Sequence, residues 1–133
     1  MSAKEYPADL LYTREHEWAR VEGKIATIGI TKFAVEQLGD VTQVDLPKEG
    51  ETLRKDDVFG SVESVKAVSD IYAPITGKVL KVNSPLSDSP EYLSEDPYDE
   101  GWILQIEVQN PEELKQLLSA AQYAEFLREQ NGG

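Results

Sequence analysis

The chain contains no cysteine, and this absence removes several kinds of chemistry at once. Without a thiol there is no disulfide, no thiolate nucleophile, no iron–sulfur cluster and no zinc site built from cysteine. Histidine is almost as scarce, because His16 is the only one. A histidine-rich metal site therefore lacks ligands, and most acid–base schemes that rely on histidine lack parts. If the protein takes part in redox chemistry, a bound or attached group must carry it.

Long apolar runs and an excess of positive charge are missing too. No stretch approaches 18 apolar residues, so we expect no membrane span. The 13 basic and 25 acidic residues leave a net charge of −12, which repels phosphate backbones and anionic lipid surfaces. The first ten residues show neither the apolar core of a signal peptide nor arginine-rich transit character. We therefore expect a cytoplasmic protein of the bacterial type, or the mature form of a mitochondrial matrix protein, with neither nucleic acid nor membrane as partner.

The remaining composition suits one small globular domain. The chain has 133 residues, of which 40% are hydrophobic and 29% charged, enough for a single core without cross-links. We expect one domain over residues 1–133, with frayed ends at 1–9 and 130–133. The domain should be a monomer.

Short apolar runs separated by turn residues predict mainly β structure. Glu22-Gly23 separates the runs 18–21 and 24–30, which predicts a tight hairpin. Alternation over 40–46 predicts a strand with one face made of Thr42, Val44 and Leu46. Trp18 and Trp102 also lie in alternating runs and are expected in the core.

Helix signals are fewer. Thr31 is placed to cap a short helix over 32–38, which Gly39 would end. Residues 84–100 contain three prolines and six acids and are expected to be loop, forming either a solvated face or a surface for a partner.

The C-terminal region changes to a helical period. Asn110-Pro111 begins a capped helix. One stripe of that helix would contain Leu114, Leu117, Leu118 and Ala121. Ser119 with Gln122 forms a second capping box, so the helix could break in two there.

Lys66 carries most of the functional signal. It lies between the apolar runs 58–64 and 69–73, where a hairpin tip would expose its amine. An exposed amine lacks the desolvation that a Schiff-base lysine needs, which argues against covalent catalysis. A tip instead suits a lysine presented to a modifying enzyme. An ordinary surface lysine remains the plain alternative.

The surroundings of Lys66 belong to a longer series of segments that resembles one family, the glycine cleavage system H proteins. The matching segments, in order, are Tyr12-Thr13-Arg14-Glu15-His16-Glu17-Trp18, Ala26-Thr27-Ile28-Gly29-Ile30-Thr31, Gln37-Leu38-Gly39-Asp40, Glu63-Ser64-Val65-Lys66-Ala67, Ser69-Asp70-Ile71-Tyr72-Ala73-Pro74, Asp88-Ser89-Pro90-Glu91, Asp96-Pro97-Tyr98 and Gly101-Trp102. They are collinear and span roughly residues 10 to 127.

This resemblance implies a lipoyl carrier with lipoate in amide linkage to Lys66. Glu63 and Gly77 match positions that lipoate-attaching enzymes read in lipoyl domains. Taken alone, Glu63 is a solvated strand acid, and Gly77 is a turn glycine that needs positive φ.

The family also implies a groove that shelters the loaded arm, and Glu17, Thr31 and Asp70 fall at positions that line it. A carboxylate there would hold the cationic amine of an aminomethyl adduct by a charge-assisted hydrogen bond. Glu15 stands where other members often carry a small polar residue. Phe33 replaces a commonly polar residue and is assigned to the core. His16 would make a structural hydrogen bond, or belong to the groove or to a docking surface.

The fold implied is mainly β: a lipoyl-domain-like barrel-sandwich of two short sheets, with a short internal helix and C-terminal helices packed outside. The function implied is that of a carrier rather than an enzyme. It would take the aminomethyl group of glycine from a pyridoxal-phosphate glycine decarboxylase to a tetrahydrofolate-dependent aminomethyltransferase. An FAD-containing dihydrolipoamide dehydrogenase would then reoxidise it. Lipoate-attaching enzymes complete the expected partners.

Five alternatives to this function stay open. A lipoyl domain of an acyltransferase would normally be followed by a Pro/Ala-rich linker, and a biotin carrier typically has Met on both sides of its lysine, where Val65 and Ala67 stand here. A relay that donates lipoyl groups, a Lys66-dependent enzyme and an acidic scaffold without any attached group are the others. Burial of Lys66 in a closed pocket would favour the enzyme.

Overall fold

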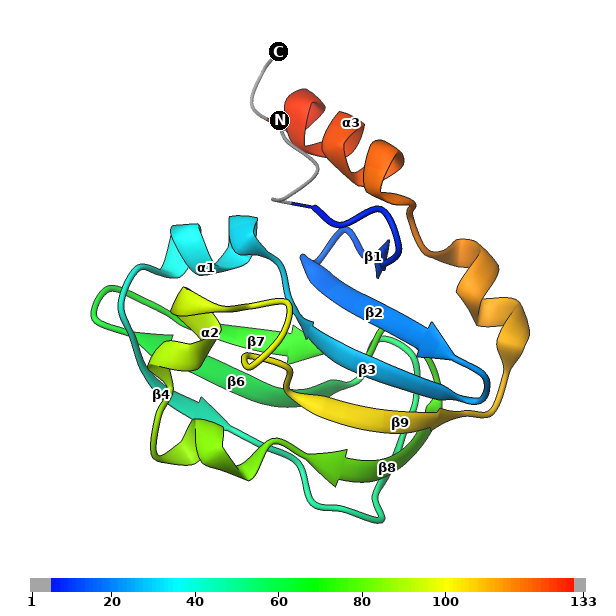
Figure 1. The fold of residues 1–133 in the computed structure, drawn as a ribbon, viewed down its shortest axis with the longest axis horizontal. Helices are drawn as coiled ribbons and strands as arrows, with labels where there is room; N and C mark the ends of the chain where they lie inside the picture. Colours follow the sequence, from blue (N-terminus) through cyan, green and yellow to red (C-terminus); the bar gives the residue numbers. More distant parts are fainter. Residues whose placement is uncertain (1–5, 131–133) are drawn as a thin grey trace.

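The structure is a computed structural model and describes residues 6–130. Its elements in chain order (Figure 1) are β1 (Leu11–Tyr12), β2 (Glu17–Glu22), β3 (Ile25–Ile30), α1 (Lys32–Leu38), β4 (Val41–Asp45), β5 (Thr52–Leu53), β6 (Val58–Ser64), β7 (Val68–Tyr72), β8 (Gly77–Val82), the 3-10 helix η1 (Ser84–Ser87), α2 (Glu91–Glu95), β9 (Leu104–Val108), the 3-10 helix η2 (Pro111–Gln116) and α3 (Ala120–Gln130).

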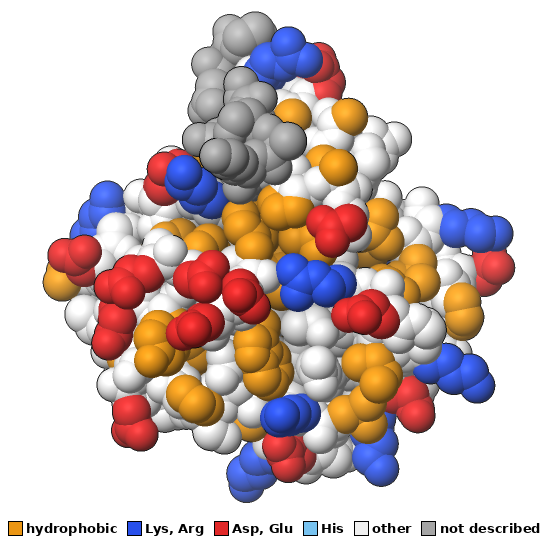
Figure 2. All heavy atoms as spheres, viewed as in Figure 1, with side chains coloured by type: hydrophobic (Ala, Val, Ile, Leu, Met, Phe, Trp, Pro, Cys, Tyr) orange, Lys and Arg blue, Asp and Glu red, His pale blue; other side chains and the backbone are white. Residues whose placement is uncertain are grey.

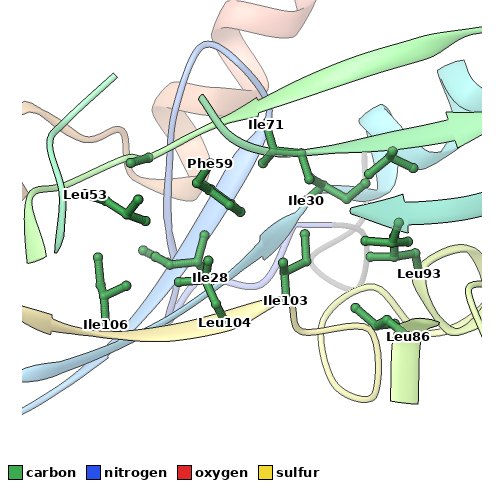
Figure 3. Close-up of a cluster of buried hydrophobic side chains, with 14 of the residues drawn as sticks. Ile28, Ile30, Leu53, Phe59, Ile71, Leu86, Leu93, Ile103, Leu104 and Ile106 are labelled. Carbon is green, nitrogen blue, oxygen red and sulfur yellow. The ribbon is translucent and has the colours of Figure 1, made fainter. Parts of the chain in front are cut away.

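The strands form two antiparallel sheets that face each other. The larger sheet has six strands in the order β1-β2-β3-β9-β8-β5, and the smaller has three in the order β4-β6-β7. Figure 3 shows the core between them, where Ile28 and Leu104 from the larger sheet meet Phe59 and Ile71 from the smaller. This arrangement confirms the predicted barrel-sandwich, and burial of these side chains is its main source of stability.

A second, aromatic core joins the beginning of the described chain to α3. The rings of Tyr12 and Tyr123 are stacked 4.9 Å apart, and Tyr6 meets Tyr123 edge-on at 5.3 Å. Trp18 is fully buried there and donates from Nε1 to the Pro97 carbonyl at 3.0 Å. The prediction that Trp18 belongs to the core is confirmed, and Trp102 packs half-buried against the same cluster.

The β2–β3 hairpin is present but shifted by one residue. Glu22 pairs with Ile25, so the two-residue link is Gly23-Lys24 rather than Glu22-Gly23. Gly23 has φ +62°, a left-handed conformation that glycine adopts without strain. The turn therefore takes Gly23 as its first residue, and this position fixes the pairing register of β2 with β3.

The alternation predicted over residues 40–46 is wrong. The pairing of β4 with β6 is irregular between Val41 and Gln43, so the residue between them, Thr42, is exposed and the buried residues are Val41 and Val44. An extra residue at a bulge reverses the faces of the residues after it. Thr42 instead donates from Oγ1 to the Glu63 carbonyl at 3.2 Å.

Residues 84–100 are not simply loop, because they contain η1 and α2. Leu86 and Leu93 are fully buried and anchor these two short helices to the main core (Figure 3). The acids of residues 84–100 remain largely at the surface. Figure 2 shows acidic side chains gathered on the side where α2 and the β6–β7 tip lie in Figure 1.

The single apolar stripe predicted for the C-terminal helix is wrong, whereas the break is confirmed. The chain is extended at Leu117, and Leu118 forms a bridge with Tyr12, so η2 and α3 are separate. Ser119 N donates to Gln122 Oε1 at 2.9 Å, and Gln122 N donates to Ser119 Oγ at 3.2 Å. The capping box therefore begins α3.

Part of the predicted frayed ends, residues 1–5 and 131–133, lies outside the described residues. Tyr6 is only 8% exposed, and the Pro7 carbonyl accepts a hydrogen bond of 2.7 Å from the Tyr12 hydroxyl. Among residues 6–130, no helix has the length and apolar character needed to cross a membrane.

Candidate functional site

Lys66 lies at the tip of the β6–β7 hairpin, as predicted, and is exposed. Ser64 organises this tip. Its Oγ accepts the backbone N–H groups of Lys66 at 3.3 Å and Ala67 at 3.1 Å, and its own N–H donates to the Ala67 carbonyl at 2.8 Å. The backbone around Lys66 is therefore fixed, while the side chain extends from a tight turn.

A second set of contacts ties the tip to the end of α1. Val65 N donates to the Asp40 carbonyl at 3.2 Å. The Lys66 side chain passes over Gly39, where an added Cβ would lie 3.1 Å from Lys66 Cε. Gly39 has φ +78° and ends α1. An exposed amine on a fixed tip is opposite to the closed pocket that a Lys66-dependent enzyme would need.

A groove of about 490 Å³ lies beside this hairpin, between β7, α1 and the turn that enters β2. Its lining is mostly apolar near α1 and the core and becomes acidic toward the β2 turn. The residues that line it are Glu15, His16, Glu17, Ile30, Phe33, Ala34, Gln37, Leu38, Val62, Ala67, Val68, Ser69, Asp70 and Ile71. Such a surface suits an apolar chain that ends in a polar or cationic group.

Glu17 is 1% exposed and lies at the acidic end of the groove. Its Oε1 accepts a hydrogen bond of 2.7 Å from the Thr13 hydroxyl, and its Oε2 accepts one of 3.2 Å from the Tyr72 N–H. Burial raises the pKa of Glu17 to about 7, although both hydrogen bonds favour the ionised form. The carboxylate thus joins the β2 turn to strand β7 and faces the groove as well.

Asp70 and Thr31 differ in their relation to the groove. Asp70 lies on β7, is exposed and lines the groove. Thr31 is fully buried and does not line it. Its Oγ1 accepts the Ala34 N–H at 3.3 Å, which caps α1 as predicted, and lies 2.8 Å from the Tyr123 hydroxyl. Thr31 therefore supports the groove wall from beneath.

The three residues beside these acids also line the groove. Phe33 is half-buried against the aromatic core, so it is both core and groove residue. His16 makes the structural hydrogen bond, with Nδ1 2.8 Å from the Tyr123 hydroxyl, and lines the groove too. Glu15 adds a third carboxylate at this end.

Glu63 and Gly77 are not brought together. Glu63 is half-buried on β6, three residues before Lys66, and pairs with Val68. Gly77 is buried at the start of β8 in the other sheet, and its φ is not positive. A Cβ there would lie 2.2 Å from the Glu107 carbonyl oxygen. The glycine is needed for close approach of two strands, which corrects the turn interpretation.

Sequence reasoning missed Ser64, Thr13 and Tyr123. A serine just before a two-residue turn is a readable signal for Ser64. The Thr13 contact closes a turn of five residues and is similarly local. Tyr123 approaches His16 and Thr31 from more than 90 residues away, and no local pattern marks it. Within residues 6–130, no group of three acidic or histidine side chains is placed to hold a metal ion.

Comparison with known proteins gives a consistent result. A family model described as "Glycine cleavage H-protein" matches residues 10–130. The chain is 56% identical over 126 residues to a glycine cleavage system H protein of Anaeromyxobacter sp., covering 95% of this chain and 98% of that one. It is 57% identical over 123 residues to that of Symbiobacterium thermophilum, covering 92% and 96%.

A solved structure agrees with the sequence relatives. The crystal structure of a glycine cleavage system H protein from Mycobacterium marinum matches with a TM-score of 0.83 at 38% identity, covering 96% of this chain and 99% of that one. The match therefore covers nearly the whole of both chains. From this fold and these matches, the chain belongs to the glycine cleavage H-protein family.

Proposed function

We propose that this protein is the lipoyl-bearing carrier of the glycine cleavage system and that Lys66 is the attachment residue. One observation carries the proposal: Lys66 is an exposed lysine on a fixed hairpin tip, directly beside an apolar groove with an acidic end. In a chain of this family, that arrangement suits a long attached arm that can leave the groove and return to it.

The groove fits such an arm by its chemistry. Side chains such as Leu38, Val62 and Ile71 offer an apolar wall for a hydrocarbon chain and a dithiolane ring. Glu17 and Asp70 lie where an amine on the arm would meet carboxylates. When attached, the lipoyl group supplies a disulfide that takes up the aminomethyl group. The protein's part is to orient the arm, hold the amine and exclude water.

The carrier serves three enzymes in this proposal. It takes the aminomethyl group from a pyridoxal-phosphate glycine decarboxylase and delivers it to a tetrahydrofolate-dependent aminomethyltransferase. An FAD-containing dihydrolipoamide dehydrogenase reoxidises the arm. The protein itself is not an enzyme, and its lack of cysteine removes any thiol of its own that could compete for disulfide exchange. It works as a monomer in the compartment of its clients, the bacterial cytoplasm or the mitochondrial matrix.

Lipoate-attaching enzymes are the fourth class of partner. Glu63 is accessible on β6 near the tip, which supports direct reading by such an enzyme. Gly77 is buried, so its contribution to attachment is indirect, through the sheet whose strands it allows to approach.

Lipoylation in the presence of a lipoate ligase tests the proposal. The intact mass should rise by one lipoyl group, and peptide mapping should place it on Lys66. Lys66→Arg keeps the positive charge but should abolish the modification. Lys78→Arg, which changes an exposed strand lysine, is the matched control and should be lipoylated like the wild type. Modification of Lys66→Arg to the wild-type extent would refute the assignment.

A further inference from the structure

His16 lies between α3 and the groove, and its backbone is held on both sides. Its N–H donates to the Thr13 carbonyl at 3.2 Å, and its carbonyl accepts the Thr31 N–H at 3.0 Å. The φ angle is +72°, in the left-handed region that Asn, Asp and His adopt more readily than most residues. The turn thus directs the imidazole to one place.

One edge of the imidazole is held by the C-terminal helix. Nδ1 lies 2.8 Å from the Tyr123 hydroxyl, and the same hydroxyl lies 2.8 Å from Thr31 Oγ1. The ring packs on Phe33, with centroids 4.6 Å apart. Tyr123 is fully buried, so these two partners satisfy its hydroxyl.

The direction of these hydrogen bonds identifies the tautomer. Burial lowers the pKa of His16, which favours a neutral ring with one N–H. The Thr31 hydroxyl proton needs an acceptor, and among residues 6–130 the Tyr123 oxygen is the one in contact with it. Tyr123 then donates to Nδ1, and the imidazole proton is on Nε2. If instead Nδ1–H donated to Tyr123 and Tyr123 donated to Thr31, the buried Thr31 hydroxyl proton would have no acceptor.

The remaining N–H is available to the groove. His16 lines the groove, and because Nδ1 is engaged, Nε2–H is the polar group that its ring offers to an occupant. The groove runs beside α1, whose seven residues span about 10 Å. Leu38 lines it near the Lys66 end, and His16 lies beside the Thr31 end. An arm that starts at Lys66 and lies along α1 ends near His16.

We propose that His16 is a positioning residue for the sulfur-bearing end of the arm, donating a hydrogen bond from Nε2–H to a sulfur atom. This inference rests on the proposed function. A thiolate is a charged acceptor, so a fixed N–H donor stabilises it and lowers the pKa of that thiol. Glu15, Glu17 and Asp70 line the same groove, Tyr123 meets the ring edge-on, and Arg14 lies over Phe126, which packs on the ring.

Two features of the sequence make the test direct. With one histidine, every imidazole signal in a nitrogen NMR spectrum comes from His16, and with no cysteine, every thiol belongs to the arm. The spectrum of the unlipoylated and lipoylated wild-type protein should show protonated Nε2 and unprotonated Nδ1. The Nε2–H signal should move when the arm is attached and reduced.

Alkylation of the reduced arm with iodoacetamide across pH gives the second readout. His16→Asn is the informative variant, because asparagine tolerates the left-handed backbone and can still bond Tyr123 but lacks Nε2. The reduced arm has two thiols, and each has a pH midpoint for alkylation. In His16→Asn the lower midpoint should rise by about one pH unit, which is the shift that loss of one hydrogen bond to a charged group produces. Phe126→Leu, which alters the packing behind the ring, should keep the wild-type midpoint.

The outcomes separate this inference from the function on which it rests. Absence of lipoylation at Lys66 would refute the proposed function. A lipoylated protein whose imidazole signals ignore the arm, or whose thiol midpoint is the same in His16→Asn and wild type, would overturn the role of His16 alone. Protonated Nδ1 in the wild-type spectrum would overturn it as well.

Discussion

Glu17 is a buried carboxylate that also faces the groove, and its burial links its ionisation to stability. Two hydrogen bonds, from Thr13 and from the Tyr72 N–H, use one lone pair on each oxygen. Glu17 also lines the groove, together with Asp70 and Glu15. The Glu17 side chain therefore joins the turn before β2 to the end of β7, and as a groove residue it is placed to receive a cation.

The pH dependence of unfolding should report Glu17. Its pKa is raised from 4.5 to about 7 in the folded protein, so folding favours the protonated acid. The resulting stabilisation is complete below pH 4.5 and is lost as the pH rises through 7, by about 3 kcal/mol in all. Glu17→Gln should remove this part of the slope of unfolding free energy between pH 5 and 8, measured by urea denaturation. Glu22→Gln, at the exposed end of the same strand, should retain it; equal slopes in all three proteins would contradict the assignment.

Individual strands and helices show where sequence patterns suffice. The helix over 32–38, with Thr31 as cap and Gly39 as its end, matches α1 residue for residue because capping is a local interaction. The Lys66 tip is likewise local. The bulge at Thr42 depends on pairing with β6, and the short helices η1 and α2 depend on burying Leu86 and Leu93. These are tertiary interactions. The local sequence therefore wrongly predicts regular alternation around Thr42 and loop over residues 84–100.

The site shows the same division. The turn around Lys66 follows from nearby residues, whereas the groove position of Asp70 was implied only by the family resemblance. Thr31 was expected on the groove surface, yet it is buried because Tyr123 packs over it from α3. Thr31 and Tyr123 are 92 residues apart in the sequence, so no local periodicity or motif spacing predicts their contact.

Gly77 should be required by the pairing of β8 with β9. A methyl group added there would overlap the Glu107 carbonyl oxygen, at 2.2 Å, and backbone cannot move aside as a side chain can. Gly77→Ala should therefore lower the unfolding free energy by about 1–3 kcal/mol, measured by denaturant titration. Lys78→Ala, on an exposed position of the same strand, should change it by no more than about 0.5 kcal/mol. Wild-type stability of Gly77→Ala would mean that the strands can separate locally without cost.

The groove exists because the two sheets, α1 and the β2 turn meet along one seam. Ile30 belongs to the larger sheet, Val62 and Ile71 belong to the smaller, and Ala34 comes from the helix. Each surface contributes only part of the lining. Shelter for an arm is thus a property of the assembled fold, while the acids add a specific interaction at one end.

Loss of the Asp70 carboxylate should shorten the lifetime of the aminomethyl-loaded arm. Asp70 is exposed, so its attraction for the amine is worth at most about 1 kcal/mol, which corresponds to up to about a fivefold change in lifetime. The carrier is loaded with the decarboxylase, freed of that enzyme, and followed by release of formaldehyde. Asp70→Asn should release it faster than wild type. Asp88→Asn changes an exposed acid outside the groove and should release formaldehyde like the wild type. If Asp70→Asn also released it at the wild-type rate, the arm would be sheltered by apolar contact and Glu17 without Asp70.

The aromatic core that joins Tyr6 and Tyr12 to Tyr123 also has a consequence for the order of events during synthesis. The hairpin that presents Lys66 leaves the ribosome long before α3 does, so its strands can pair first. Translation of the roughly 55 residues from β7 to α3 takes on the order of 3–10 s at typical rates. Until then His16 and Thr31 lack the hydroxyl that holds them. On the proposed function, the attachment lysine is therefore synthesised seconds before the helix that completes the end of the groove.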